Sequence, residues 1–127
     1  MGEKIAAAAA LDLAVLSRLC AITPAVVNGA HICESEGIPL TYYADLFPEG
    51  DRARSLALAI HQDNFTDDVI TSVNTAISCL AAIKAYADDL GINSEVPTFG
   101  VDFYHRAADA GLGDHDATAL IKVLRAN

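Results

Sequence analysis

Residues 2–36, GEKIAAAAALDLAVLSRLCAITPAVVNGAHICESE, form an alanine-rich apolar run that decides the fold. Alanine and leucine are frequent and no glycine lies between Ile5 and Gly29, so the run predicts one long helix. Pro24 removes a backbone donor and crowds the preceding turn, which predicts a kink near residues 21–24 without requiring a break. At 1.5 Å per residue this helix is roughly 50 Å long, more than a domain of this size needs. The excess length indicates a contact beyond this chain.

The apolar side chains of this helix predict burial on most of its sides. Projected at about 100° per residue, they fill an arc of roughly 200°. Asp12 falls near the centre of that arc, where an unpartnered carboxylate would cost several kcal/mol. It therefore needs a cation, a hydrogen-bond network or a water-filled cleft, and the residues alone leave open whether Asp12 serves chemistry or is paired only for structure. The members of the arc are Leu11, Ile22, Val15, Val26, Leu19, Leu16, Val27, Cys20 and Leu13.

Length and composition predict a single helical domain. The 127 residues suit one domain, with residues 1–36 as the long helix and 37–127 as the remaining helices. A hydrophobic content of 53% with few glycines and prolines is typical of a helical globule. The formal charge of −9 argues against nucleic acid or an anionic membrane as partner, because both require clusters of Lys and Arg.

The charged residues and the cysteines predict a soluble, cytoplasmic chain. Asp12 and Arg18 interrupt the apolar run, which argues against a signal peptide and a membrane span. The three cysteines, Cys20, Cys33 and Cys79, have no CxxC spacing and fit reduced thiols better than disulfides or a zinc site.

A second long helix is predicted to begin at a cap, Thr66 or Asp67, and to end at Gly91. Its apolar residues repeat every three or four positions, so it should pack antiparallel along the first helix at the centre of the domain. That stripe consists of Val69, Val73, Ile77, Leu80 and Ile83.

Shorter helices complete an all-α bundle. Two are expected between the long helices, over residues 40–47 and 51–61. A third runs from 97 to 110 with its two phenylalanines in the core, and a fourth covers 117–124. The phenylalanines are Phe99 and Phe103; the expected terminating glycines are Gly111 and Gly113, and Asp114 or Asp116 is the expected cap of the last helix.

The common cofactor and metal motifs are missing from the sequence. There is no GxGxxG after a strand and no GxxxxGK[ST], so the chain has no dinucleotide or nucleoside-triphosphate cradle of its own. The four histidines lack the i, i+4 spacing of a helical metal site, and we expect no metal. No Ser-His or Cys-His nucleophile pair can be assigned.

Three stretches in register resemble one family. They are residues 7–16 (AAAALDLAVL), residues 91–97 (GINSEVP), and residues 106–114 (RAADAGLGD) followed by 119–121 (ALI). With them the chain resembles the C-terminal helical domain of the imine reductase and reductive aminase group, within the superfamily of 3-hydroxyisobutyrate and 6-phosphogluconate dehydrogenases. The resemblance covers nearly the whole chain.

The resemblance implies an NAD(P)H-dependent oxidoreductase whose cofactor, NADP or NAD, is bound mainly by an N-terminal Rossmann domain absent from this chain. It implies an intertwined homodimer and a small-molecule substrate held between the Rossmann domain of one subunit and the helical domain of the other. Asp12 is then the catalytic residue, which orients or protonates a cationic imine or amine. Leu16, Cys20 and Leu80 are the expected substrate-binding residues.

The sequence departs from the hydroxyacid dehydrogenases at their catalytic positions. Their lysine, and the asparagine one turn later, correspond to Asp12 and Leu16 here, and their Lys-Asp pair on the second long helix falls at Ser78 and Cys79. Many imine reductase relatives carry an aromatic residue two turns after the acid, where this chain has Cys20. Two alternatives therefore stay open: a non-catalytic helical module for dimerisation or small-ligand binding, and the helical domain of a 3-hydroxyacid dehydrogenase-like enzyme.

Overall fold

The computed structural model describes the backbone of residues 2–126 and the side chains of residues 7–126. Within that range the elements are helical and no strand occurs, which confirms the predicted all-α class. In chain order they are α1 (Gly2–Ser35), α2 (Leu40–Asp45), α3 (Arg52–Gln62), α4 (Val73–Leu90), α5 (Glu95–Ala107), a π-helical turn η1 (Ala108–Leu112), a 3-10 turn η2 (Ala117–Ala119) and α6 (Leu120–Arg125).

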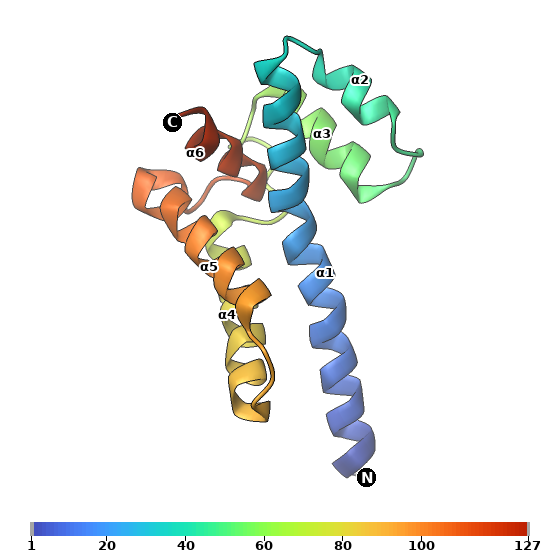
Figure 1. The fold of residues 1–127 in the computed structure, drawn as a ribbon, viewed down its shortest axis with the longest axis vertical. Helices are drawn as coiled ribbons and strands as arrows, with labels where there is room; N and C mark the ends of the chain where they lie inside the picture. The colour runs from blue at the N-terminus through green and yellow to red at the C-terminus, as the bar shows by residue number, and fades with distance from the viewer. Residues whose placement is uncertain (1, 127) are drawn as a thin grey trace.

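The long helix α1 is the axis of the fold, as predicted. It continues through Pro24 without a break. Figure 1 shows α2 and α3 on one side of its C-terminal half and α6 on the other, with α5 and α4 following on that second side toward the N-terminus of α1; the N-terminal end of α1 extends past α4. Among the side chains of α1 that the structure describes, from residue 7 onward, the buried ones lie between Cys20 and Ala30.

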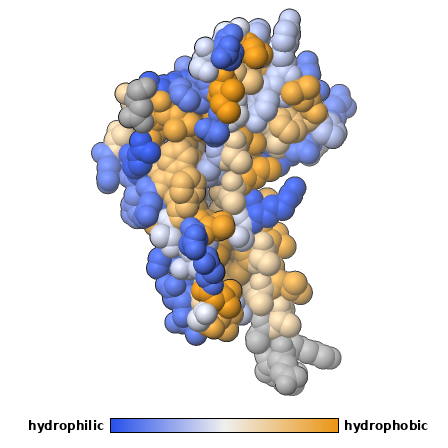
Figure 2. Space-filling model, in the orientation of Figure 1, coloured by the Kyte–Doolittle hydropathy of each residue, from blue (hydrophilic) through white to orange (hydrophobic). Residues whose placement is uncertain are grey.

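Residues 7–19 of α1 are exposed or only partly buried in this chain, so the single chain does not bury this part of the helix on most sides. Leu11 is 67% exposed and Val15 is 60% exposed. Figure 2 shows mostly apolar side chains on the coloured part of this segment. By length and composition alone, residues 7–35 could cross a bilayer. The core helix of a soluble protein can have the same length and composition, and 28% of the most apolar 18-residue stretch of this helix is buried in the fold.

The second long helix starts later than predicted. Ser72 caps it by accepting a hydrogen bond from the Thr75 amide at 3.0 Å, and Gly91 closes it in the left-handed conformation, as expected. Residues 66–67 belong to a turn instead, because the Asn64 side chain accepts hydrogen bonds from the amides of Thr66 and Asp67. Val69 therefore lies outside the helix and is 40% exposed.

Helix α4 runs antiparallel to α1, as predicted, but its most extensive partner is α5. The buried face of α5 also differs from the prediction. Phe99 is 65% exposed and Phe103 only partly buried, whereas Tyr104 is 1% exposed. Gly111 has a positive φ of 86°, but Gly113 stays in the right-handed region, so only one of the two predicted glycines turns the chain.

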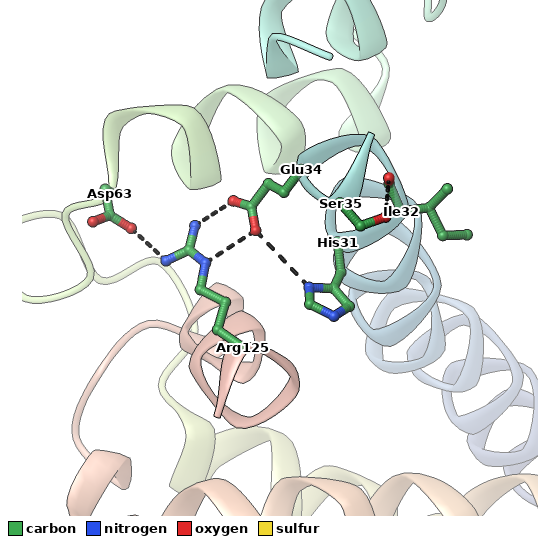
Figure 3. Close-up of polar contacts among 6 residues, drawn as sticks. All are labelled: His31, Ile32, Glu34, Ser35, Asp63 and Arg125. Carbon is green, nitrogen blue, oxygen red and sulfur yellow. Dashed lines mark hydrogen bonds and ion pairs between the residues drawn. The ribbon is translucent and has the colours of Figure 1, made fainter. Parts of the chain in front are cut away.

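Salt bridges fasten the C-terminal end of α1 to the last helix. Figure 3 shows Arg125 of α6 between Glu34 of α1 and Asp63 after α3. Its Nε lies 3.1 Å from Glu34 Oε2 and its Nη1 lies 2.8 Å from Asp63 Oδ1. The hydrogen bonds that the Arg125 guanidinium donates to Glu34 and Asp63 raise its pKa further. His31 Nδ1 lies 3.9 Å from Glu34 at the edge of this network.

Candidate functional site

A cavity of about 390 Å³ opens where α1 meets α3, α4 and α5, and we call it the inner cavity. Its wall is mostly apolar with a few hydroxyl and thiol groups. The lining residues are Leu16, Leu19, Cys20, Thr23, Arg52, Ile70, Thr71, Thr75, Ala76, Cys79, Tyr104 and Ala117.

Two of the predicted substrate-binding residues, Leu16 and Cys20, line this cavity together. Asp12 does not line it, but the three residues are spaced four apart on one helix and therefore share a face. Asp12 lies one turn before Leu16 on the projecting half of α1, where its side chain is exposed. This face of α1 therefore carries the exposed carboxylate of Asp12 at one end and, from Leu16 onward, side chains that line the mostly apolar inner cavity.

Tyr104 closes the inner cavity from α5, and the sequence interpretation overlooked it. Burial raises the pKa of its hydroxyl, which lies within hydrogen-bonding reach of the Thr23 side chain. The phenol therefore stays protonated in this apolar setting. A signal was present: the buried face of α5 is Pro97, Gly100, Tyr104 and Ala107, spaced by three or four residues.

Asp116 organises the wall beside η2. It is 7% exposed, and its Oδ1 accepts hydrogen bonds from the amides of Ile70 at 3.0 Å and Thr71 at 3.4 Å. Its Oδ2 accepts from the Thr118 amide at 3.1 Å and from the Thr118 hydroxyl. Both carboxylate oxygens are therefore committed to structure. The predicted helix cap at this position is confirmed, but its link to residues 70 and 71 was not foreseen.

Arg52 is the one charged residue among those that line the inner cavity. It is the first residue of α3, next to the cap Asp51, whose side chain accepts from the Ala53 amide. Within the described part of the chain, the Arg52 guanidinium has no carboxylate partner, and its charge acts on the nearby Tyr104 hydroxyl. No sequence pattern singles out Arg52, since its place in the cavity depends on how α3 packs.

Cys20 and Cys79 face each other across the contact of α1 with α4. Both thiols are free, and they lie within hydrogen-bonding reach. Burial, with a further contribution from Cys79, raises the pKa of Cys20 from its ordinary value of 9.0 to about 11. Cys20 is therefore a neutral thiol at physiological pH. The sequence interpretation assigned Cys20 to the site, but it neither assigned Cys79 there nor predicted that the two meet.

A larger groove of about 580 Å³, which we call the outer groove, lies between α1, α4 and α5. The predicted residue Leu80 belongs here and not with Leu16 and Cys20. Gly100 permits the close packing of α5 on α4, because a Cβ atom there would lie 2.8 Å from Leu80 Cδ1. Phe99 and Phe103 also line this groove, with their ring centroids 5.9 Å apart.

No group of three or more His, Cys, Asp or Glu side chains in the described residues is arranged to hold a metal ion. What the site provides is an apolar wall with hydroxyl groups, thiols and one cation.

Comparisons with known proteins agree with this architecture. Residues 4–126 match the family described as NADPH-dependent reductive aminase-like, C-terminal domain. The structure is similar to 3-hydroxyisobutyrate dehydrogenase from Salmonella typhimurium, with a TM-score of 0.80 at 17% identity. That match covers 90% of this chain and 41% of the dehydrogenase, so the chain corresponds to less than half of that protein. No curated protein matched the sequence.

Proposed function

Because this chain belongs to the family of NADPH-dependent reductive aminase-like C-terminal domains, we propose that it is the substrate-binding and dimerisation part of an oxidoreductase that reduces a C=N bond. One observation carries the proposal: Asp12, Leu16 and Cys20 share a face of α1. On that face the exposed carboxylate of Asp12 lies one turn before the side chains that line the inner cavity. A domain outside this chain supplies the cofactor, and we expect the enzyme to be cytoplasmic.

Each part of that face has a distinct task in this proposal. The nicotinamide cofactor supplies the hydride when it is bound. The apolar wall around Leu16 and Cys20 holds the hydrocarbon part of the substrate and excludes water. Asp12 stabilises positive charge on the imine nitrogen and can transfer a proton to it. The exposure of Asp12 in this chain is consistent with a cleft that another domain or subunit completes.

A hydroxyacid dehydrogenase-like function is the second candidate, and Arg52 is the observation that favours it. The chain carries a formal charge of −9, yet the charged residue in its inner cavity is a cation. A guanidinium matches a carboxylate in shape and charge, and apolar walls accept a short hydrocarbon. The Thr75 hydroxyl can donate to the same ligand, because its oxygen already accepts from Ser72 at 2.9 Å.

Arg52→Gln separates the two candidates when it is tested in the complete enzyme, with neutral imines and carboxylate-bearing substrates as parallel panels. If Arg52 binds a carboxylate, the substitution should raise the KM of the carboxylate substrates about 10- to 100-fold, the loss of one charged hydrogen bond. The KM of neutral imines should change less than twofold. Steady-state rates of NADPH oxidation, and of NADP reduction with hydroxyacids, give both values.

Arg18→Gln is the matched control, since Arg18 is an exposed arginine on α1 that lines neither cavity. Turnover of neutral imines by the wild-type enzyme supports imine reduction. Turnover of hydroxyacids alone supports the second candidate. A complete protein that turns over neither panel, but whose chain still binds small ligands, would favour the non-catalytic module.

We also propose that the exposed half of α1 forms a homodimer contact. Leu11, Val15 and Leu19 form an exposed apolar strip along α1, and such strips are typical of protein–protein contacts. The outer groove offers a matching apolar surface, with Val96 61% exposed and Phe99 65% exposed. In a two-fold symmetric dimer, the apolar strip of each chain packs into the outer groove of the other chain, so one arrangement covers both surfaces.

Val15→Lys should convert the dimer to a monomer at micromolar concentration, because it places a charge in the centre of the apolar strip. Light scattering measures the change against the chain mass of 13.3 kDa. Ile32→Lys is the control, since Ile32 is on the same helix and is 56% exposed but lies near its other end. A wild-type chain that is monomeric under these conditions contradicts the proposed contact.

A further inference from the structure

Two thiols from different helices meet in the wall of the inner cavity. Cys20 comes from the middle of α1 and Cys79 from α4, 59 positions later in the sequence. Both line the cavity, and their side chains are within hydrogen-bonding reach of each other. A disulfide between them requires Cβ atoms about 4 Å apart.

The third cysteine lies elsewhere and provides an internal reference. Cys33 is on α1 beside Tyr43, 13 residues from Cys20, which corresponds to about 20 Å along the helix. It is partly buried, as Cys79 is. The chain therefore holds one close pair of thiols and one separate thiol of comparable exposure.

We propose that Cys20 and Cys79 are an oxidation site, at which a reversible disulfide joins α1 to α4 across the inner cavity. The oxidant is a peroxide or a small-molecule disulfide that reaches the pair through the cavity. The proposal for the thiols stands apart from the proposed enzymatic function, and only its effect on catalysis rests on that function.

The more accessible thiol reacts first. Cys79 is partly buried and Cys20 is 8% exposed, so the thiolate of Cys79 attacks the peroxide oxygen, which gives a sulfenic acid and one water after protonation. Cys20 then attacks the sulfenic sulfur, its proton leaves with the displaced hydroxide as a second water, and the sulfur–sulfur bond forms. Overall, two thiols and one peroxide give one disulfide and two waters. With a small-molecule disulfide as oxidant, Cys79 first forms a mixed disulfide and releases one thiol, and the attack of Cys20 on the Cys79 sulfur releases the second thiol.

The disulfide changes the site itself. The sulfur atoms move from a hydrogen-bonding separation to a bond of about 2.05 Å, which draws the two helices together at the cavity wall. Leu16 precedes Cys20 by one turn and Thr75 precedes Cys79 by one turn, so both are displaced with the thiols. The oxidised inner cavity is therefore smaller and more rigid than the reduced one.

The test treats the protein with hydrogen peroxide or oxidised glutathione, followed by intact mass measurement, thiol counting and peptide mapping. We expect each chain to lose the mass of two hydrogen atoms, to retain one free thiol at Cys33, and to yield a cross-linked peptide pair containing Cys20 and Cys79. Dithiothreitol should restore all three thiols.

Three serine variants make the result decisive. Cys33→Ser should still form the internal disulfide, whereas Cys20→Ser and Cys79→Ser should not. Cross-links between chains through Cys33, or over-oxidation of Cys79 while Cys20 stays free, overturn the proposal. In the complete enzyme, oxidation should reduce turnover at least tenfold, and Cys79→Ser should abolish that sensitivity. If the complete protein has no activity, the mass measurement still decides the disulfide, so the two proposals fail separately.

Discussion

In the complete enzyme, Asp12→Ala is expected to lower kcat for imine reduction by about 10²- to 10⁴-fold, the usual contribution of a positioned acid–base group. The physical reason is that a carboxylate at this point both stabilises a cationic nitrogen and carries a proton. Asp12→Asn keeps the size and the hydrogen-bonding oxygen but cannot transfer the proton, so it should lose nearly as much activity. Steady-state kinetics with saturating cofactor measures both variants.

Neither Asp12 variant should change the thermal unfolding of this chain. Asp12 is exposed on the projecting half of α1 and makes no hydrogen bond or ion pair within the described residues. Asp89→Asn is the matched control, because Asp89 is an exposed helical acid that lines neither the inner cavity nor the outer groove. Activity that survives Asp12→Ala would show that the carboxylate is not used in chemistry. Loss of folding would assign it a structural role.

The helices themselves were largely predictable, because their signals are local. The alanine-rich run has high intrinsic propensity, and the observed α1 ends at Ser35, one residue before the end of the predicted run. Asp51 and Asp116 cap the elements that follow them, and Gly91 closes α4, each as its residue type favours. Such signals act over a few residues, so sequence alone contains them.

The errors arose where distant parts of the chain decide between two local signals. Two cap sequences precede α4, one at residues 66–67 and one at Ser72. Asp116 selects the second, because it holds the amides of Ile70 and Thr71 outside the helix. On α5 the two phenylalanines gave a strong apolar signal, but the small residue Gly100 sets the face on which α5 approaches α4.

The candidate site was predictable only along a single helix. Asp12, Leu16 and Cys20 could be assigned to one face because the helix fixes their spacing. Leu80 was grouped with them, although it lines the outer groove on another side of the bundle. Arg52, Tyr104 and Cys79 were not assigned to the site because only the packing of α3, α5 and α4 brings them to the inner cavity.

Asp116→Ala should destabilise the fold by about 3–5 kcal/mol, since it removes the acceptor for several buried or partly buried donors at once. The amides of Ile70, Thr71 and Thr118 lose their partner, and each unsatisfied donor costs about 1–3 kcal/mol. Urea unfolding followed by circular dichroism measures the change. Asp116→Asn should cost less, because its remaining oxygen can still accept from Ile70 and Thr71.

The adjacent acid Asp114 is the control for this substitution. It is exposed, and its hydrogen bond with the Asn74 side chain is long, at 3.4 Å, so Asp114→Ala should change the stability by less than about 0.5 kcal/mol. Equal effects of the two substitutions would contradict the role given to Asp116. Because Ile70, Thr71 and Ala117 all line the inner cavity, Asp116→Asn should also weaken ligand binding there, even under conditions where the chain remains folded. The buried carboxylate would thus support the site without contacting its ligand.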